Sequence, residues 1–152
     1  MNGADAVRML GWTRERLTKF LESVPEEFLD YKPPMEIPKT ETYKKPRAIL
    51  SHVVGVESYW IHEKIVMKTF ETSLWSFPKK SMQEIVDAMN KVRNRTLEWL
   101  NENIDRDLEQ TYTPRAQKSF ACLFYHVAEH EAHHLGQLSL LTTFAGIKTP
   151  WV

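Results

Sequence analysis

Apolar residues recur every three to four positions in four segments of the chain, with polar residues between them. This spacing predicts α-helices over 4–24, 46–70, 81–103 and 119–145. No stretch alternates convincingly between apolar and polar residues in the manner of a half-buried strand. The pattern therefore predicts an all-α fold.

Residues typical of helix ends flank these segments. Pro25 ends the first helix, and Pro46 suits the first turn of the second. Ser81 and Glu84 form the capping-box pattern, in which each side chain accepts a hydrogen bond from a backbone N–H at the start of a helix. Gly146 is placed to end the fourth helix.

Four amphipathic helices that each need a partner for one apolar stripe predict a four-helix bundle. We expect a single domain over 1–152. The connection over 25–45 holds four prolines and is long enough to cross over the bundle, so simple up-down-up-down order is not expected. The same connection could form a wall of a pocket.

Composition narrows the classes of function. Twenty Lys and Arg residues balance twenty Asp and Glu residues, and no segment gathers basic residues, so we expect no nucleic-acid partner. No apolar run approaches the roughly 20 residues that span a bilayer, so no membrane insertion is expected. Cys122 is the single cysteine and the first residues lack the layout of a signal peptide, which together predict a cytoplasmic protein.

The stretch "HVAEHEAHHLGQL" over 126–138 holds four of the six histidines of the chain. On a helical projection, His134 falls within the arc of apolar residues that should face the core, and His130 lies just outside it. His126 and His133 lie farther round, on the flank. The apolar arc of this helix is formed by Phe120, Leu123, Val127, Leu138 and Leu141.

His130 and His134 are four residues apart, a spacing that lets two imidazoles on one helix bind the same metal ion. His52 interrupts the apolar stripe of the second helix and is the candidate third ligand, whereas His62 on that helix is expected to point away. Three imidazoles leave a coordination position open, as in catalytic zinc sites, and nickel, cobalt or iron can occupy similar sites.

Two other interpretations remain open at this stage. The histidines could be ordinary polar residues of a bundle that pair with nearby carboxylates, such as Glu57, Glu129 and Glu131. Alternatively, His126 and His130, which are also four residues apart, could be the metal-binding pair. A cluster of core-facing histidines favours metal binding, because without a ligand their burial is costly.

The segments "ILSHVVGVESYW" and "HVAEHEAHHLGQL" resemble the signatures of the DinB-like family, to which the bacillithiol transferases and mycothiol-dependent maleylpyruvate isomerases are related. The resemblance implies a four-helix bundle with long crossover connections in up-down-down-up order. It also implies that His52, His130 and His134 bind a divalent metal ion, with zinc or nickel as the expected metals. Many members of the family are dimers, so a homodimer is expected.

The motif departs from the family at Leu135, where other members often carry arginine. This difference affects a polar contact rather than the metal ligands. We expect Gly136 to allow close approach of another helix, and Gln137 to hydrogen-bond a ligand histidine or a bound water. His133 is expected to lie on the flank, outside the ligand set.

No pair of a nucleophile and a base stands out in the sequence, and no catalytic residue is assigned. The leading hypothesis, drawn from the resemblance, is transfer of a low-molecular-weight thiol such as bacillithiol to an electrophilic small-molecule substrate. A hydrolase that uses a metal-bound hydroxide is the alternative among enzymes. A non-catalytic, stress-related metal-binding or interaction bundle is the alternative of a different class, and a fourth protein ligand such as His126 or Glu57 would favour it.

Overall fold

The computed structural model describes residues 1–34, 45–67, 76–113 and 117–149. Four α-helices dominate this part of the chain, and its β-structure consists of two isolated bridges rather than strands. The all-α prediction is therefore confirmed. The elements are α1 (Gly3–Glu22), the 3₁₀-helix η1 (Glu26–Asp30), α2 (Pro46–Glu57), the π-helical turn η3 (Ser58–Glu63), α3 (Met82–Glu102) and α4 (Phe120–Phe144).

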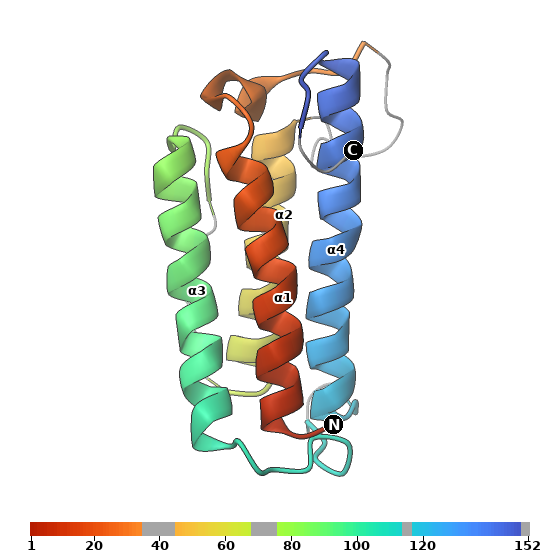
Figure 1. Ribbon diagram of the computed structural model, residues 1–152. Coiled ribbons are helices and arrows are strands. Elements are labelled where there is room, and N and C mark those ends of the chain that lie inside the picture. Colours follow the sequence, from red (N-terminus) through yellow and green to blue (C-terminus); the bar gives the residue numbers. More distant parts are fainter. Residues whose placement is uncertain (35–44, 68–75, 114–116, 150–152) are drawn as a thin grey trace.

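The helices form a bundle in which α1 and α2 each pack against both α3 and α4 (Figure 1). The colours of Figure 1 run upward along α1 and α4 and downward along α2 and α3. Backbone hydrogen bonds agree with these directions. Ala4 N–H donates to the carbonyl of Ile104 and Ala121 N–H donates to that of Leu108, so α1 and α4 both begin beside the end of α3.

The predicted helix ends are mostly confirmed. Ser81 and Glu84 make both hydrogen bonds of the capping box at the start of α3. Gly146 follows α4 with a φ of +71°, a left-handed conformation that glycine adopts without steric cost. The observed limits of α1, α3 and α4 lie within two residues of the predicted ones.

The second helix differs from its prediction over 46–70. Its α-helical part ends at Glu57, and the chain continues as the π-helical turn η3 over Ser58–Glu63. The predicted end near Phe70 falls within 68–75, outside the described residues. A π turn changes the angle between successive side chains, so a pattern that assumes 3.6 residues per turn does not locate the residues of η3.

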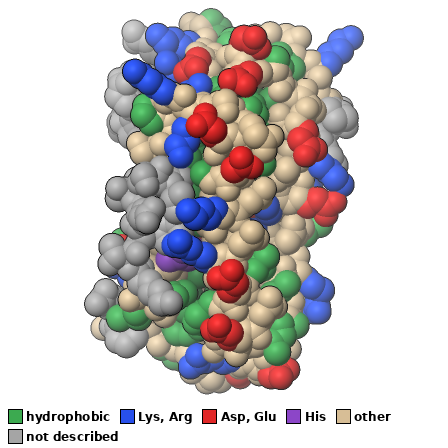
Figure 2. Space-filling view, turned by 90° about the vertical axis from the view of Figure 1, so that its left-hand side faces the viewer, with side chains coloured by type: hydrophobic (Ala, Val, Ile, Leu, Met, Phe, Trp, Pro, Cys, Tyr) green, Lys and Arg blue, Asp and Glu red, His purple; other side chains and the backbone are tan. Residues whose placement is uncertain are grey.

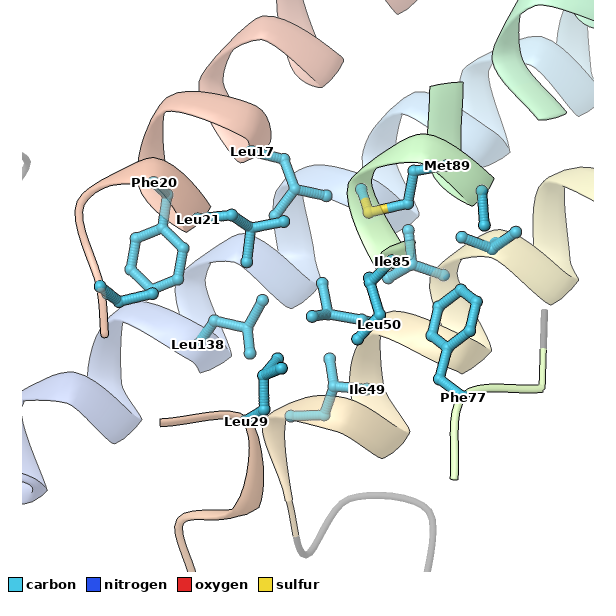
Figure 3. Packing of buried hydrophobic residues seen from close by; sticks show 14 of the residues in the cluster. Leu17, Phe20, Leu21, Leu29, Ile49, Leu50, Phe77, Ile85, Met89 and Leu138 are labelled. Atoms are coloured by element: carbon cyan, nitrogen blue, oxygen red, sulfur yellow. The ribbon is translucent and has the colours of Figure 1, made fainter. Parts of the chain in front are cut away.

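Apolar side chains from all four helices meet in the core. In Figure 3, Leu21 of α1, Leu50 of α2, Ile85 of α3 and Leu138 of α4 point toward one another, and all four are buried. A second cluster lies nearer the other end of the bundle and includes Phe124. Within the described residues, no helix is long and apolar enough to cross a membrane.

Candidate metal centre

His52 from α2 and the pair His130 and His134 from α4 point toward a common centre. Nε2 of His130 lies 3.0 Å from Nε2 of His52 and 3.1 Å from Nε2 of His134. One candidate ligand atom from each residue lies within 4.8 Å of those from the other two. The structure thus brings together the three histidines that the sequence selected.

The environment of these histidines favours the neutral imidazole. Burial, and after it the positive charge of the neighbouring histidines, lower the pKa of His130 to about 3. Burial also lowers the pKa of His134 to about 4, although the hydrogen bond that His134 donates to Gln137 raises it. Burial lowers the pKa of His52 as well. Neutral imidazoles carry a nitrogen lone pair, which a metal ion requires.

Gln137 orients His134 through a direct hydrogen bond. Nδ1 of His134 lies 2.7 Å from Oε1 of Gln137, and because an amide oxygen can only accept, Nδ1 carries the proton. The lone pair of His134 is therefore on Nε2, the atom that faces the other two histidines. Nε2 of Gln137 in turn donates to Nε2 of His133 at 2.9 Å. The expected hydrogen bond between Gln137 and a histidine of the candidate site is confirmed, and His133 lies one hydrogen bond further out.

The remaining histidines lie outside the cluster. His126 stacks edge-on against Trp60, with the ring centres 5.8 Å apart, and its ring centre is 5.7 Å from that of His130. His62 does not join the cluster, as expected, but it does not face outward either. It is buried, and its Nε2 lies 2.9 Å from the hydroxyl oxygen of Thr96 on α3. The π turn gives it this direction.

A layer of four charged side chains, one from each helix, crosses the bundle next to the cluster. Arg93 of α3 binds Glu57 of α2 through two nitrogens, at 2.8 and 3.1 Å, and it also lies 3.2 Å from Glu131 of α4. Arg14 of α1 lies 2.6 Å from Glu131 and 2.9 Å from Glu57. All four side chains are buried. We refer to Arg14, Glu57, Arg93 and Glu131 as the ionic layer.

The ionic layer was not predicted from the sequence, although a signal was present. Arg14 lies four residues after Leu10 and three before Leu17, which places it on the apolar stripe of its helix. Glu131 likewise lies three residues before His134 on the inward side of α4. Charged residues at positions that should face the core indicate buried ion pairs, because an isolated charge is too costly to bury.

The ionic layer corrects the interpretation in which Glu57 and Glu131 pair with the clustered histidines. Both carboxylates form ion pairs with arginines. Although burial by itself raises the pKa of Glu57, Arg93 and Arg14 lower it to about 2, so the group is ionised.

The expectation for Gly136 is also wrong for this chain. A Cβ atom at Gly136 would meet no described atom within 4 Å, so no described helix packs closely there.

The donor set fits a divalent transition metal. Zinc–nitrogen bonds of about 2.0–2.1 Å, at angles of about 90–110°, place two ligand nitrogens roughly 2.8–3.4 Å apart. The two Nε2 separations of 3.0 and 3.1 Å at His130 agree with this range. Among the described residues the candidate ligand group consists of His52, His130 and His134, with neither Glu57 nor His126 as a fourth member.

Comparison with known proteins gives a family match and a match of the fold. The sequence matches a family model described as the DinB superfamily over residues 9–138. The fold is similar to the crystal structure of an uncharacterised protein from Escherichia coli UTI89, with a TM-score of 0.74 and 14% sequence identity, over 97% of this chain and 96% of that chain. At this identity the likeness concerns the fold alone. No curated protein matches the sequence significantly.

Proposed function

The chain belongs to the DinB superfamily, which is associated with metal binding, and from this membership we propose that it is a metal-dependent enzyme acting at His52, His130 and His134. The proposed reaction transfers a low-molecular-weight thiol, such as bacillithiol, to an electrophilic small-molecule substrate. The observation that carries the proposal is the convergence of three neutral imidazoles in a group with no fourth described protein ligand. Structural zinc sites usually have four protein ligands, whereas catalytic sites leave one position open.

The residues of the chain hold and prepare this centre. Imidazole nitrogen suits zinc and nickel, which are the ions that we propose. Such an ion, when bound, lowers the pKa of a coordinated thiol so that the thiolate forms near neutral pH. Burial keeps His130 and His134 unprotonated, so protons do not compete for the ligand nitrogens. Gln137 holds the lone pair of His134 toward the centre.

The attacking sulfur is expected to come from the thiol cosubstrate rather than from the protein. Cys122 is exposed and lies eight residues before His130, about 12 Å along the helix axis. In the proposed reaction, the thiolate sulfur forms a bond to carbon while a carbon–halogen bond, an epoxide carbon–oxygen bond or the π bond of an unsaturated carbonyl compound breaks. The thiol proton goes to water when halide leaves, to the epoxide oxygen, or to the α-carbon of the carbonyl compound.

The test measures consumption of bacillithiol, glutathione and cysteine with epoxide, alkyl halide and unsaturated carbonyl substrates. Metal-loaded protein should exceed the uncatalysed rate, and the metal-free protein and His134→Ala should not. His126→Ala is the matched control, because His126 lies beside the cluster without belonging to it. Metal-dependent hydrolysis of esters or amides without thiol transfer would replace this proposal with a hydrolase. Inactivity in both assays would favour a non-catalytic metal-binding protein.

A further inference from the structure

A cavity of about 220 Å³ lies in the groove between α1 and α4, two helices that run side by side in Figure 1. Buried residues form its deep side, and exposed residues form its rim. Its lining includes Trp12, Thr13, Arg16, Phe20, Leu135 and Gly136. None of these residues belongs to the candidate metal centre, whose histidines come from α2 and α4. The cavity is therefore a separate feature of the surface.

Trp12 and Arg16 lie about one turn apart on α1, at the mouth of the cavity. The guanidinium carbon of Arg16 lies 4.8 Å from the centre of the Trp12 ring, and Trp12 is 57% exposed. An indole offers a flat apolar surface on which a planar ligand can stack, and a guanidinium offers paired N–H groups that match the two oxygens of a carboxylate. The mouth of the cavity thus provides an aromatic surface and a positive charge together.

Gly136 lines the same cavity from the middle of α4. Glycine destabilises the interior of a helix relative to alanine, so its presence requires a reason. Close packing of another helix is not that reason, because a Cβ atom at this position would meet no described atom within 4 Å. The cavity supplies a reason, since the missing side chain leaves room that a larger residue would occupy.

Arg16 carries the one charge among the described residues that line the cavity. Glu131 lies behind Thr13, whose hydroxyl donates to its carboxylate at 2.6 Å. The charge of Glu131 is balanced by Arg14 and Arg93 of the ionic layer, so it does not offset the positive charge at the mouth of the cavity. An anionic group is the complementary partner of such a site.

The outward side of α3 provides a contrast. Figure 2 shows positive and negative side chains interspersed over this face, which lies on the left-hand side of Figure 1. A depression in it is lined by polar residues and by charged residues of both signs, including Asp87, Lys91 and Glu98. Such a surface is expected of a helix that faces water, and it selects neither an apolar nor an anionic ligand. The cavity between α1 and α4 differs in both respects.

We propose that the cavity between α1 and α4 binds a small aromatic carboxylate. The ring lies against Phe20 and Leu135, and the carboxylate accepts hydrogen bonds from the guanidinium of Arg16 at the mouth. The size fits, because a cavity of about 150 Å³ holds benzene, and 220 Å³ leaves room for a short substituent as well. Small-molecule sites commonly combine an apolar lining with a few polar groups that orient the ligand.

Calorimetric titration of the metal-free protein with phenylacetate tests the proposal. Metal-free protein is used because a carboxylate could also bind a metal ion, so the result does not depend on the proposed function. Phenylacetate should bind with a dissociation constant below about 1 mM, a value consistent with a ligand of this size. Acetate, which lacks the ring, and phenethylamine, which carries the opposite charge, should each bind more weakly by about 10-fold or more. Phenylacetate that does not bind in this range, or binding of either control ligand with equal affinity, would overturn the proposal.

Four variants test the position of the site. Arg16→Gln removes the charge and Gly136→Leu fills the space, and each should raise the dissociation constant of phenylacetate by about 10-fold or more. Arg8→Gln and Gly11→Leu are the matched controls and should leave it unchanged, since both residues are exposed on α1 outside the cavity lining. Circular dichroism should show the same helical content in all four variants, because all four positions are exposed. Unchanged affinity in Arg16→Gln or Gly136→Leu, or an equal loss in the control variants, would refute the assignment of the site.

Discussion

His134 donates a hydrogen bond from Nδ1 to Oε1 of Gln137, with the two atoms 2.7 Å apart. This contact directs the lone pair on Nε2 of His134 toward the other two histidines of the cluster. A side chain that hydrogen-bonds a metal ligand holds that ligand in the orientation that binding requires. Its loss typically lowers the metal affinity by about 10–100-fold. Gln137 is therefore a positioning residue for the proposed metal centre.

Replacement of Gln137 by Leu should weaken metal binding by about 10–100-fold, because His134 then loses the acceptor that fixes its tautomer. Competition with a chelator measures the affinity. Gln83→Leu is the control, since Gln83 lies exposed on α3 and bonds Asp87 instead of a histidine. Unchanged affinity in Gln137→Leu would show that the contact with His134 does not support the metal.

The three proposed ligands should be separable from their neighbours by metal content. We expect about one divalent ion per chain in protein purified without an affinity tag, and loss of that ion in His52→Ala, His130→Ala and His134→Ala. His126→Ala should retain it. Elemental analysis of each variant measures the ratio. Full occupancy in all three ligand variants, or loss in His126→Ala alone, would contradict the assignment.

The ionic layer should make stability sensitive to the loss of one charge. Glu57→Gln removes a carboxylate that binds both Arg14 and Arg93, and it leaves two buried guanidinium groups with a single carboxylate between them. We expect a loss of about 3–5 kcal/mol in the free energy of unfolding, measured by urea denaturation. Glu98→Gln on the exposed side of α3 should change it by less than about 0.5 kcal/mol.

His62 should make stability depend on pH. Burial lowers the pKa of His62 to about 4, below its ordinary value of 6.5, so the unfolded chain binds more protons between these values. The contribution of neutral His62 to the free energy of unfolding is therefore complete above pH 6.5 and is lost as the pH falls toward 4. The full shift corresponds to about 3 kcal/mol.

The variant His62→Gln isolates this contribution, because glutamine does not titrate and its amide can still reach Thr96. Its unfolding free energy should fall less steeply than that of the wild type between pH 6.5 and 4. The same slope in both proteins would mean that His62 does not carry the dependence. Urea denaturation at a series of pH values provides the comparison.

The sequence predicted the parts of the structure that depend on helical spacing. His130 and His134 share a face because they are one turn apart, and His52 lies on the apolar stripe of α2, so the pattern places all three on inward faces of their helices. The start of α3 follows from the capping residue Ser81, and the end of α4 follows from Gly146. These features are set by residues close together in the chain.

The features that the sequence did not predict depend on contacts between helices. The π turn over Ser58–Glu63 holds His62 against Thr96, a residue 34 positions away. Arg14 and Arg93 are buried because carboxylates from α2 and α4 meet them at the same level of the bundle. A helical projection places Arg14 on the apolar side of its helix, but it contains no information about that level and so does not identify the carboxylates that pair with the arginines.

The ionic layer has a consequence for the precision of the metal centre. If one helix slid by a turn, about 5.4 Å, a buried charge would face hydrocarbon instead of its partner. His52 lies five residues before Glu57 and His134 three after Glu131, so the same slip would separate the ligand nitrogens. A variant with apolar residues at all four positions of the ionic layer should therefore bind metal more weakly. This should hold even if the variant unfolds at a higher urea concentration than the wild type. The axial alignment of the three proposed ligands is thus set by charged side chains that are not themselves proposed to bind the metal.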